Sequence, residues 1–412
     1  MKNKELGIYI HIPFCKHKCY YCDFVSFSSK EEIVEKYIKT VIKELKKYLE
    51  NKEFMKNYNV TTIYIGGGTP SYIDSKYIEE ILKEIEKNLV NNDTKFQDIE
   101  VTLEVNPGTI NEEKVNLYKE AKINRISMGL QSTNDQILKQ IGRIHTYNEF
   151  LDAYSIVKKA GFDNINIDLM IGLPNQTISD VKESLNKIIE LNPNHISVYS
   201  LILEEGTVLD KLIEEGKMEL LDEELERSMY WYVKNTLEIN GFNHYEISNF
   251  SKTGKESKHN LNCWEQKEYI GIGTSAHSYI NGVRYCNKSS VEKYIENINN
   301  KDIDVNEIIK LGNGDENFLG KVEEVYEIDE IQSLEDKKRE YMLLGLRKLK
   351  GIKISSFKEK YIENPIYVYH KELEKLAEED LIRIDGDRIF LSRRGIDSVS
   401  YTHLTLPTIL RV

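Results

Sequence analysis

The sequence predicts an α/β protein: a partial (β/α)6 barrel of the TIM type, followed by a smaller, mainly helical domain of winged-helix type. Three observations lead to this prediction. Strand-like and helix-like segments alternate over residues 7–201, the strand-like segments alternate polar with apolar residues, and a hairpin pattern follows two helices near the C-terminus. Repeated strand–helix alternation is typical of parallel βαβ units.

Six segments have the pattern of a strand, namely residues 7–12, 61–66, 99–105, 125–130, 164–170 and 195–201. Helix-length segments with apolar residues at helical spacing, such as 31–49 and 75–89, lie between them. Several strands carry polar residues on one face: Tyr9 and His11, Thr102 and Glu104, and Asn164, Asn166 and Asp168. Because ordinary parallel strands are apolar on both faces, we expect this face to line a wet or ligand-filled lumen. An open sheet with one solvated face is the alternative.

The strand–helix rhythm fades after about residue 222. A helix is expected next, followed by loops rich in asparagine, serine and aromatic residues over 241–285. Residues 301–330 hold 3 basic and 10 acidic residues, a net charge of −7. Such a run of like charge is typical of a solvated linker or insertion.

The C-terminal segment predicts a winged-helix-like unit. Helices are expected over 340–349 and 371–380, and residues 381–395 form a hairpin pattern with Asp385 and Gly386 at the turn. The last residues, 399–412, have Arg411 as their only formal charge and differ from the rest of the chain. We interpret them as a non-native tail without function.

Composition limits the classes of function. The 412 residues include 56 Lys and Arg against 68 Asp and Glu, a net charge of −12, and residues 331–400 balance 15 basic with 13 acidic side chains. Binding to nucleic-acid phosphates needs a basic face, so no nucleic-acid partner is expected. No apolar run approaches the roughly 20 residues that span a bilayer. Because His11 and Pro13 interrupt the first apolar stretch, it is a poor signal peptide, and we expect a cytoplasmic protein.

Three of the five cysteines lie close together, directly after the first strand: Cys15, Cys19 and Cys22. A disulfide framework needs even pairing and an oxidising compartment, and neither is indicated. Three thiolates can hold three irons of a [4Fe–4S] cluster and leave the fourth iron open to a bidentate substrate. The alternative is a zinc site that His11 or His17 completes.

A glycine-rich segment, Gly66–Ser71 (GGGTPS), lies at the end of the second strand. Glycines permit close approach of the backbone to a ligand. The exposed N–H and C=O groups of such a turn can hold the ammonium and carboxylate of an amino acid. By itself this motif is weak, but it follows the cysteine triplet by one strand.

Taken together, the two motifs resemble the radical S-adenosylmethionine superfamily, whose signature is a CxxxCxxC loop after the first barrel strand and a GGE-like motif after the second. Further segments resemble its HemN-like branch over residues 7–395: HIPFCKHKCYYCDF, GGGTPS, LEVNPGT, GLQS, GRIHT, IDLMIGLPNQT and YEISNF. That branch contains the oxygen-independent coproporphyrinogen III oxidase and a related haem chaperone.

The resemblance implies site residues. Cys15, Cys19 and Cys22 would ligate the [4Fe–4S] cluster, and the S-adenosylmethionine site would be lined by Tyr9, Tyr21, Gly67, Gly68, Thr69, Glu104, Gln131, Arg143, Asp168 and Ile202. The residue types agree with this assignment. Glu104 and Asp168 lie on the polar strand faces, where carboxylates can accept hydrogen bonds from ribose hydroxyls. Arg143 suits the methionyl carboxylate, and a surface ion pair is its ordinary alternative.

Two differences within the branch favour the chaperone. Phe24 stands where the oxidases carry a further cysteine, and residues 259–264 (HNLNCW) resemble the chaperone's haem-binding motif HNxxYW. Neutral imidazole is a normal axial ligand of haem iron, so His259 is the expected ligand, and Trp264 could stack on a porphyrin. Cys263 replaces the tyrosine of the motif; it is either a substitute ligand or a small buried residue.

The resemblance thus implies a cytoplasmic haem chaperone with a [4Fe–4S] cluster, S-adenosylmethionine and haem. Its partners would be an unidentified acceptor haemoprotein, soluble or membrane-associated, and an electron donor such as flavodoxin or ferredoxin, with the chain a monomer or dimer. The alternative is the oxidase, in which a 5′-deoxyadenosyl radical initiates decarboxylation of coproporphyrinogen propionates. Whether the protein is an enzyme stays open. The expected domains are the barrel (1–230), an extension with the haem motif (231–300), an acidic linker (301–335), the winged-helix-like domain (336–398) and the tail (399–412).

Overall fold

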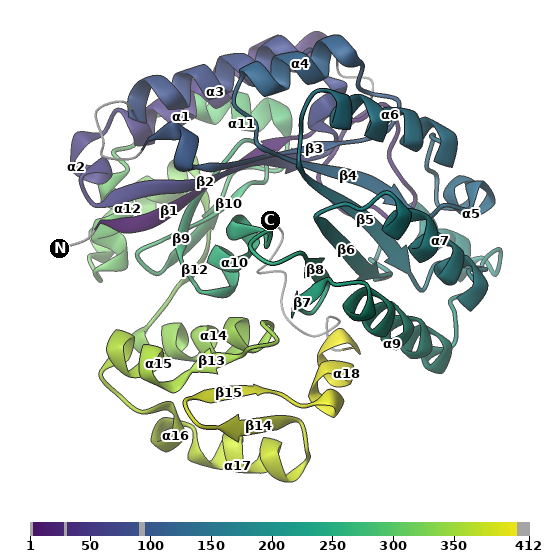
Figure 1. Ribbon diagram of the computed structural model, residues 1–412. Helices are drawn as coiled ribbons and strands as arrows, with labels where there is room; N and C mark the ends of the chain where they lie inside the picture. The colour runs from purple at the N-terminus through teal and green to yellow at the C-terminus, as the bar shows by residue number, and fades with distance from the viewer. Residues whose placement is uncertain (1–2, 29–30, 90–94, 402–412) are drawn as a thin grey trace.

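The computed structural model describes residues 3–28, 31–89 and 95–401. Its centre is a 12-stranded sheet in the order β12-β11-β10-β9-β1-β2-β3-β4-β5-β6-β8-β7 (Figure 1). The strands of its middle are β1 (Lys4–Ile12), β2 (Tyr58–Gly67), β3 (Glu100–Val105), β4 (Arg125–Gln131), β5 (Asn164–Ile171) and β6 (His195–Ser200). Each of the six predicted strand segments overlaps one of them.

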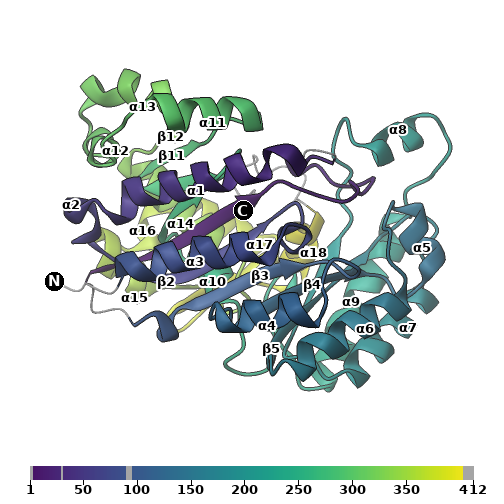
Figure 2. The ribbon, with the colours of Figure 1, turned by 90° about the horizontal axis from the view of Figure 1, so that it is seen from above.

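The six strands run parallel and pair in chain order, as a partial barrel requires. Helices cover their outer face (Figures 1 and 2): α1 (Val34–Leu49), α3 (Ser75–Leu89), α4 (Glu112–Glu120), α6 (Tyr147–Lys159) and α7 (Ile178–Glu190). The barrel stays open because β1 pairs on its other side with β9, and β6 pairs with β8. The predicted fold class is confirmed.

The segment 241–285, expected as loops, contains short strands that lengthen the sheet at both edges. They are β7 (Asn243–Glu246), β8 (Asn249–Ser251), β9 (Glu268–Ile272), β10 (His277–Ile280) and β11 (Val283–Cys286). The expectation of loops is wrong because strands of three to five residues are too short to display a clear period of two. The predicted domain boundary at residue 230 falls inside one helix, α9 (Glu223–Ile239).

Residues 301–335, expected as a solvated linker, are folded. They form α12 (Asn306–Gly312), the short 3-10 helix η4 (Glu316–Phe318), α13 (Leu319–Val325) and β12 (Glu327–Ile331), the last strand at that sheet edge. Val305, Ile308 and Val322 are at most 1% exposed and join the main core. The net charge of the segment did not predict this folding, because most of its acidic side chains face solvent while its few apolar side chains face inward.

The C-terminal residues form a small α/β unit of winged-helix type. Its helices are α14 (Leu334–Leu346), α15 (Ile354–Tyr361), α16 (Pro365–Val368), α17 (His370–Glu378) and α18 (Arg393–Tyr401), and its three-stranded sheet contains β13 (Ile352–Lys353), β14 (Ile382–Asp385) and β15 (Arg388–Leu391). The hairpin β14–β15 turns at Gly386, whose φ is +54°, as predicted from the Asp-Gly pair. Most of the predicted tail, residues 402–412, lies outside the described residues.

The C-terminal unit covers the concave side of the open barrel, where α10 (Lys258–Trp264) also lies (Figure 1). Backbone hydrogen bonds join the C-terminal unit to β7 and the residue after it: Ile247 N–H donates to the Arg347 carbonyl (3.2 Å), and Leu349 N–H donates to the Tyr245 carbonyl (3.0 Å). The remaining helices are α2 (Lys52–Met55), α5 (Asp135–Gln140), α8 (Val208–Glu214), α11 (Val291–Asn300) and the 3-10 helices η1 (Glu31–Ile33), η2 (Pro70–Tyr72) and η3 (Phe96–Asp98). Among the helices described, none is both long enough and apolar enough to cross a membrane.

Candidate functional site

A cavity of about 830 Å³ lies on the concave side of the sheet, at the carboxyl ends of β2 to β6. All predicted site residues except one line it: Cys15, Cys19, Tyr21, Cys22, Gly67, Gly68, Thr69, Glu104, Gln131, Arg143, Asp168, Ile202, His259, Cys263 and Trp264. Residues that are far apart in the sequence therefore share one space. The carboxyl end of a barrel is where this type of fold builds its active sites.

Tyr9 is the exception, because it lies in the sheet below the cavity and does not line it. Its side chain is 4% exposed, and its hydroxyl is 2.9 Å from Nδ1 of His11. The Nε2 atom of His11 is 2.8 Å from the carbonyl oxygen of Val25. Tyr9 is therefore linked to the cysteine loop through His11.

The cysteine loop begins at the end of β1 and is held by the backbone. Cys15 N–H donates to the Phe27 carbonyl (3.0 Å), and Phe27 N–H donates to the Pro13 carbonyl (2.7 Å). These two hydrogen bonds hold the first and last residues of the loop together. Thr69 Oγ1 lies 3.5 Å from the Cys15 sulfur. All three cysteines are free, and burial raises the pKa of Cys22 to about 12.

This donor set fits an iron–sulfur cluster better than zinc with His11. A [4Fe–4S] cluster takes cysteine thiolates as ligands, and here three cysteines share one loop that opens into a cavity. Both ring nitrogens of His11 are engaged, by Tyr9 and Val25. A Cβ on Gly68 would lie 2.9 Å from the Cys15 sulfur, so glycine leaves the space next to that sulfur open.

Beside this loop, the glycine turn brings Glu104 into the cavity. Gly67, at φ +112°, donates its N–H to one carboxylate oxygen of Glu104 (3.1 Å), and Tyr64 donates its hydroxyl to the other (2.8 Å). Burial raises the pKa of Glu104 to about 7, opposed by the Tyr64 hydrogen bond and reinforced by Asp168. A half-buried carboxylate with free acceptor capacity suits the hydroxyls of a ribose.

Arg143 extends across the cavity floor and links the strand ends to the cysteine loop. Its Nη2 donates to Asn106 Oδ1 (2.8 Å) and to the Gly129 carbonyl, while Nη1 is 3.6 Å from the Cys19 sulfur. Asn106 also donates from Nδ2 to Thr69 Oγ1 (2.8 Å), so it joins the glycine turn to Arg143. Asn106 is a site residue that was not predicted, although it lies in LEVNPGT, one of the segments that carry the resemblance.

Asp168 lies in a polar layer on the inner face of β4, β5 and β6. Ser127 donates to one of its oxygens (3.1 Å), and Asn166 donates to the other (2.7 Å). Asn166 is itself linked to His195, whose Nδ1 is 2.6 Å from Asn166 Oδ1. The predicted alternation of polar and apolar residues therefore corresponds to a hydrogen-bonded layer under the cavity, and burial raises the pKa of Asp168 within it.

His259 lies on α10 and lines the cavity. Its side chain is 2% exposed, its Nδ1 is 2.9 Å from Thr62 Oγ1, and its ring lies over Tyr64 with centroids 5.2 Å apart. Nε2 is buried and has no hydrogen-bond partner among the described residues. Burial lowers the pKa of His259 to about 3, with a smaller contribution from Arg125. The imidazole is therefore neutral at physiological pH.

The rest of the predicted haem motif lies beside His259. Cys263 is 9% exposed, and burial raises its thiol pKa to about 12, as for a small buried residue rather than a thiolate. Trp264 has the guanidinium of Arg347 over its ring, 4.4 Å from the centroid. Arg347 lines the same cavity but comes from the C-terminal unit, where nothing in the sequence marked it.

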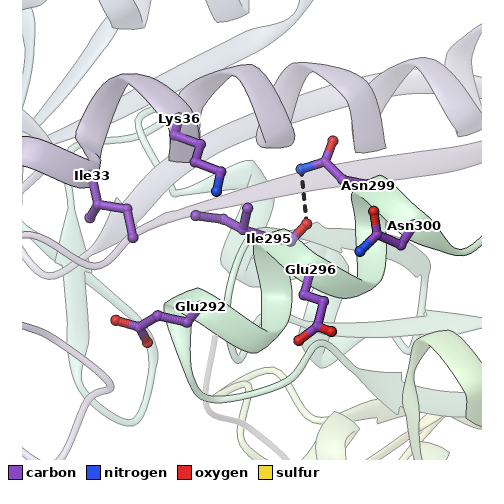
Figure 3. Close-up of a pocket in the computed structure, with 7 residues that line it drawn as sticks. All are labelled: Ile33, Lys36, Glu292, Ile295, Glu296, Asn299 and Asn300. Atoms are coloured by element: carbon purple, nitrogen blue, oxygen red, sulfur yellow. Dashed lines mark hydrogen bonds between the residues drawn. The ribbon is translucent and has the colours of Figure 1, made fainter.

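A second, smaller recess lies between α1 and α11 (Figure 3). It is lined by Ile33, Lys36, Glu292, Ile295, Glu296, Asn299 and Asn300, and Asn299 donates to the Ile295 carbonyl (2.8 Å). None of the predicted site residues lines it. The larger cavity is therefore the candidate functional site.

Comparisons with known proteins identify the family of the chain. Residues 9–188 match the family model of the radical SAM superfamily, and residues 332–397 match that of the HemN C-terminal domain. Proteins named haem chaperone HemW are similar to the chain over nearly its whole length. The HemW of Lactococcus lactis is 36% identical, and the match covers 96% of both chains. The HemW of Bacillus subtilis is 34% identical, and the match covers 94% of this chain and 95% of the relative.

The HemW of Escherichia coli is 35% identical over 68% of this chain and 71% of its own. Among solved structures, coproporphyrinogen III oxidase HemN from Escherichia coli superposes with a TM-score of 0.76 over 97% of this chain and 91% of its own. At 19% identity, that likeness establishes the fold alone.

Proposed function

The chain belongs to the haem chaperone HemW family of radical SAM proteins, and on this premise we propose that it binds haem in the cavity and passes it to an acceptor haemoprotein. The observation that carries the proposal is His259. It lines the cavity together with the cysteine loop, and its buried Nε2 has no hydrogen-bond partner among the described residues.

The environment of His259 suits an axial ligand of haem iron. When Nδ1 donates its proton to Thr62, Nε2 keeps the lone pair that coordinates the metal. Because the pKa of His259 is about 3, protons do not compete for Nε2 at neutral pH. Another histidine, His145, also lines the cavity, and its Nε2 has no hydrogen-bond partner among the described residues. An experiment therefore has to distinguish haem binding by His259 from haem binding by His145.

The cysteine loop and the strand ends would hold the other two groups. Cys15, Cys19 and Cys22 would ligate the [4Fe–4S] cluster, which supplies low-potential electron transfer when bound. Glu104, Asp168 and Arg143 would orient S-adenosylmethionine beside it, with the glycine turn next to its amino-acid end. About 830 Å³ is at the upper end of ligand cavities, which leaves space for more than one small molecule.

The acceptor and the electron donor follow from the same proposal. The donor would be a small redox protein such as flavodoxin or ferredoxin, and the acceptor a soluble or membrane-associated haemoprotein that meets the chain in the cytoplasm. Monomer and dimer are both compatible with this role.

The test is an anaerobic titration of cluster-reconstituted protein with haemin, following the Soret band. Wild type is expected to saturate near one haem per chain, and His259→Ala to lose the specific band. His145→Ala is the matched control, because it removes another cavity histidine whose Nε2 has no hydrogen-bond partner among the described residues, and it should bind as wild type. Equal binding by wild type and His259→Ala would overturn the assignment.

A second assay separates the chaperone from the oxidase. Coproporphyrinogen III is incubated with the reconstituted protein, S-adenosylmethionine and a reductant in the absence of oxygen. Because Phe24 stands where the oxidases carry a further cysteine, no protoporphyrinogen is expected. Its formation would assign the cavity to the oxidase reaction instead.

A further inference from the structure

A histidine, a cysteine and an aspartate come together on three neighbouring strands, outside the cavity. They are His277 on β10, Cys286 on β11 and Asp329 on β12, and one ligand atom of each lies within 4.8 Å of the others. We infer that these three side chains form a zinc site, separate from the cysteine loop.

Sheet register brings the three residues together. His277 and Cys286 are directly opposite each other in the antiparallel pair β10–β11, and Cys286 is opposite Glu327 in the pair β11–β12. The register then shifts by one residue, because Tyr285 pairs with Ile328 and Arg284 with Glu330. Asp329 is the extra residue of this bulge, a feature that re-aims side chains in sheets.

The distances are close to those of a tetrahedral site. His277 Nε2 is 3.4 Å from one Asp329 oxygen, and the Cys286 sulfur is 3.9 Å from the other. With Zn–S near 2.3 Å and Zn–N and Zn–O near 2.0–2.2 Å, tetrahedral ligands lie about 3.3–3.6 Å apart. Because the three ligand atoms lie within 4.8 Å of one another, shifts of up to about 1 Å would complete the geometry.

The donor types select the metal. One sulfur, one imidazole nitrogen and one carboxylate oxygen form a borderline set that suits Zn²⁺ better than Mg²⁺ or Ca²⁺, which take oxygen ligands. Glu327, whose Oε2 is 4.0 Å from the Cys286 sulfur, or a water would supply the fourth ligand. On binding, the Cys286 S–H bond breaks, the sulfur donates its electron pair to zinc and the proton passes to solvent.

The inference does not depend on haem binding. None of the three residues lines the cavity, and β12 belongs to the acidic segment whose predicted role was a linker. Zinc there would fasten β12 to β10 and β11 at the open edge of the sheet. A simple ion pair between His277 and Asp329 is the alternative, and it predicts no retained metal.

The test measures zinc and iron in the same anaerobic sample. Protein produced with zinc and reconstituted with its cluster is passed through a chelating column, and both metals are counted by mass spectrometry. About one zinc per chain is expected in wild type and close to none in Cys286→Ser and His277→Gln, with iron unchanged. Cys263→Ser and His370→Gln are matched controls, which should retain zinc.

Zinc-edge X-ray absorption of the wild type tests the site without any substitution. One sulfur near 2.3 Å with nitrogen and oxygen ligands near 2.0–2.2 Å is expected. Three sulfur ligands would place the zinc in the cysteine loop and overturn the inference. A wild type that retains no zinc would overturn it equally.

Discussion

His259 is buried, lines the cavity, and has a ring nitrogen, Nε2, with no hydrogen-bond partner among the described residues. Burial lowers its pKa to about 3, whereas an ordinary histidine titrates near pH 6.5. Because the shift is downward, the folded protein keeps the neutral ring until the pH falls far below the ordinary value.

We therefore expect the affinity for haemin to be flat from pH 8 to pH 5.5. A histidine of ordinary pKa would lose affinity progressively below pH 6.5, approaching about tenfold for each pH unit, since protonation blocks Nε2. Soret titrations at half-unit steps measure this. A weakening of about fivefold between pH 6.5 and 5.5, as a pKa near 6.5 would give, would contradict the buried neutral state of His259.

Among the glycines of the glycine-rich turn, Gly67 is the one on which the site depends most. Its φ of +112° is strained for any other residue, and a Cβ would lie 2.5 Å from the His11 ring. Gly108 is a natural control, with φ +78° and no atom within 4 Å of its would-be Cβ. An alanine at either position would have backbone strain, but only an alanine at Gly67 would also have a steric contact. Comparing the two substitutions therefore separates the two effects.

Gly108→Ala is expected to cost about 1 kcal/mol of unfolding free energy, from positive φ alone. Gly67→Ala is expected to cost about 3 kcal/mol or more, because the contact with His11 is added to the strain. Urea denaturation gives both values, and equilibrium dialysis should show that only Gly67→Ala impairs S-adenosylmethionine binding. Equal costs would mean that His11 can move aside.

At the scale of residues, the sequence predicts a role for a side chain where a local motif or strand period marks it. It does not predict the role where the contacts of the side chain depend on residues far away in the sequence. The cysteine triplet and the polar residues of β3 and β5 could be assigned because a motif or a strand period marks them. Tyr9 obeyed the same period, yet it contacts His11 and not the cavity. Arg347 carries no pattern, because only the packing of the C-terminal unit brings its guanidinium to Trp264.

Among elements, the parallel strands were predictable and the edge strands were not. β1 to β6 have six to ten residues each and a regular alternation with helices. β7 to β11 have three to five residues, and their place in the sheet depends on partners far away in the sequence. The acidic segment is the clearest case: its net charge predicts a linker, but its sparse apolar residues decide its structure.

A pair of substitutions on α13 tests whether that segment is folded. Val322 is fully buried in the main core, whereas its neighbour Glu323 is exposed. Val322→Ala is expected to lower the free energy of unfolding by about 1–3 kcal/mol, because it leaves a cavity. Glu323→Ala should change it by less than about 0.5 kcal/mol. If the segment were a solvated linker, neither substitution would change the free energy of unfolding in the same denaturation experiment.

At the scale of the whole molecule, three parts of the chain enclose one cavity. The barrel supplies its floor, α10 supplies His259 and the C-terminal unit supplies Arg347. A winged-helix-like unit at the end of a chain often suggests nucleic acid, but here it contributes a cavity residue. This arrangement could not be predicted from the sequence, because the docking rests on contacts such as Ile247 with Arg347, a hundred residues apart.

Arg347 should therefore control how fast haem leaves. Its guanidinium covers Trp264 at the cavity wall, and such a contact contributes about 0.5–2 kcal/mol when desolvated. We expect Arg347→Ala to speed transfer of bound haem to excess apomyoglobin, used as a trap, by about 2- to 30-fold, since every 1.4 kcal/mol is tenfold. Arg393 is a matched control, because its guanidinium also covers a tryptophan at 4.4 Å, Trp231, and lies outside the cavity lining. Arg393→Ala should release haem at the wild-type rate. Faster release by both variants would mean that docking of the C-terminal unit as a whole, and not the Arg347 contact, retains the haem.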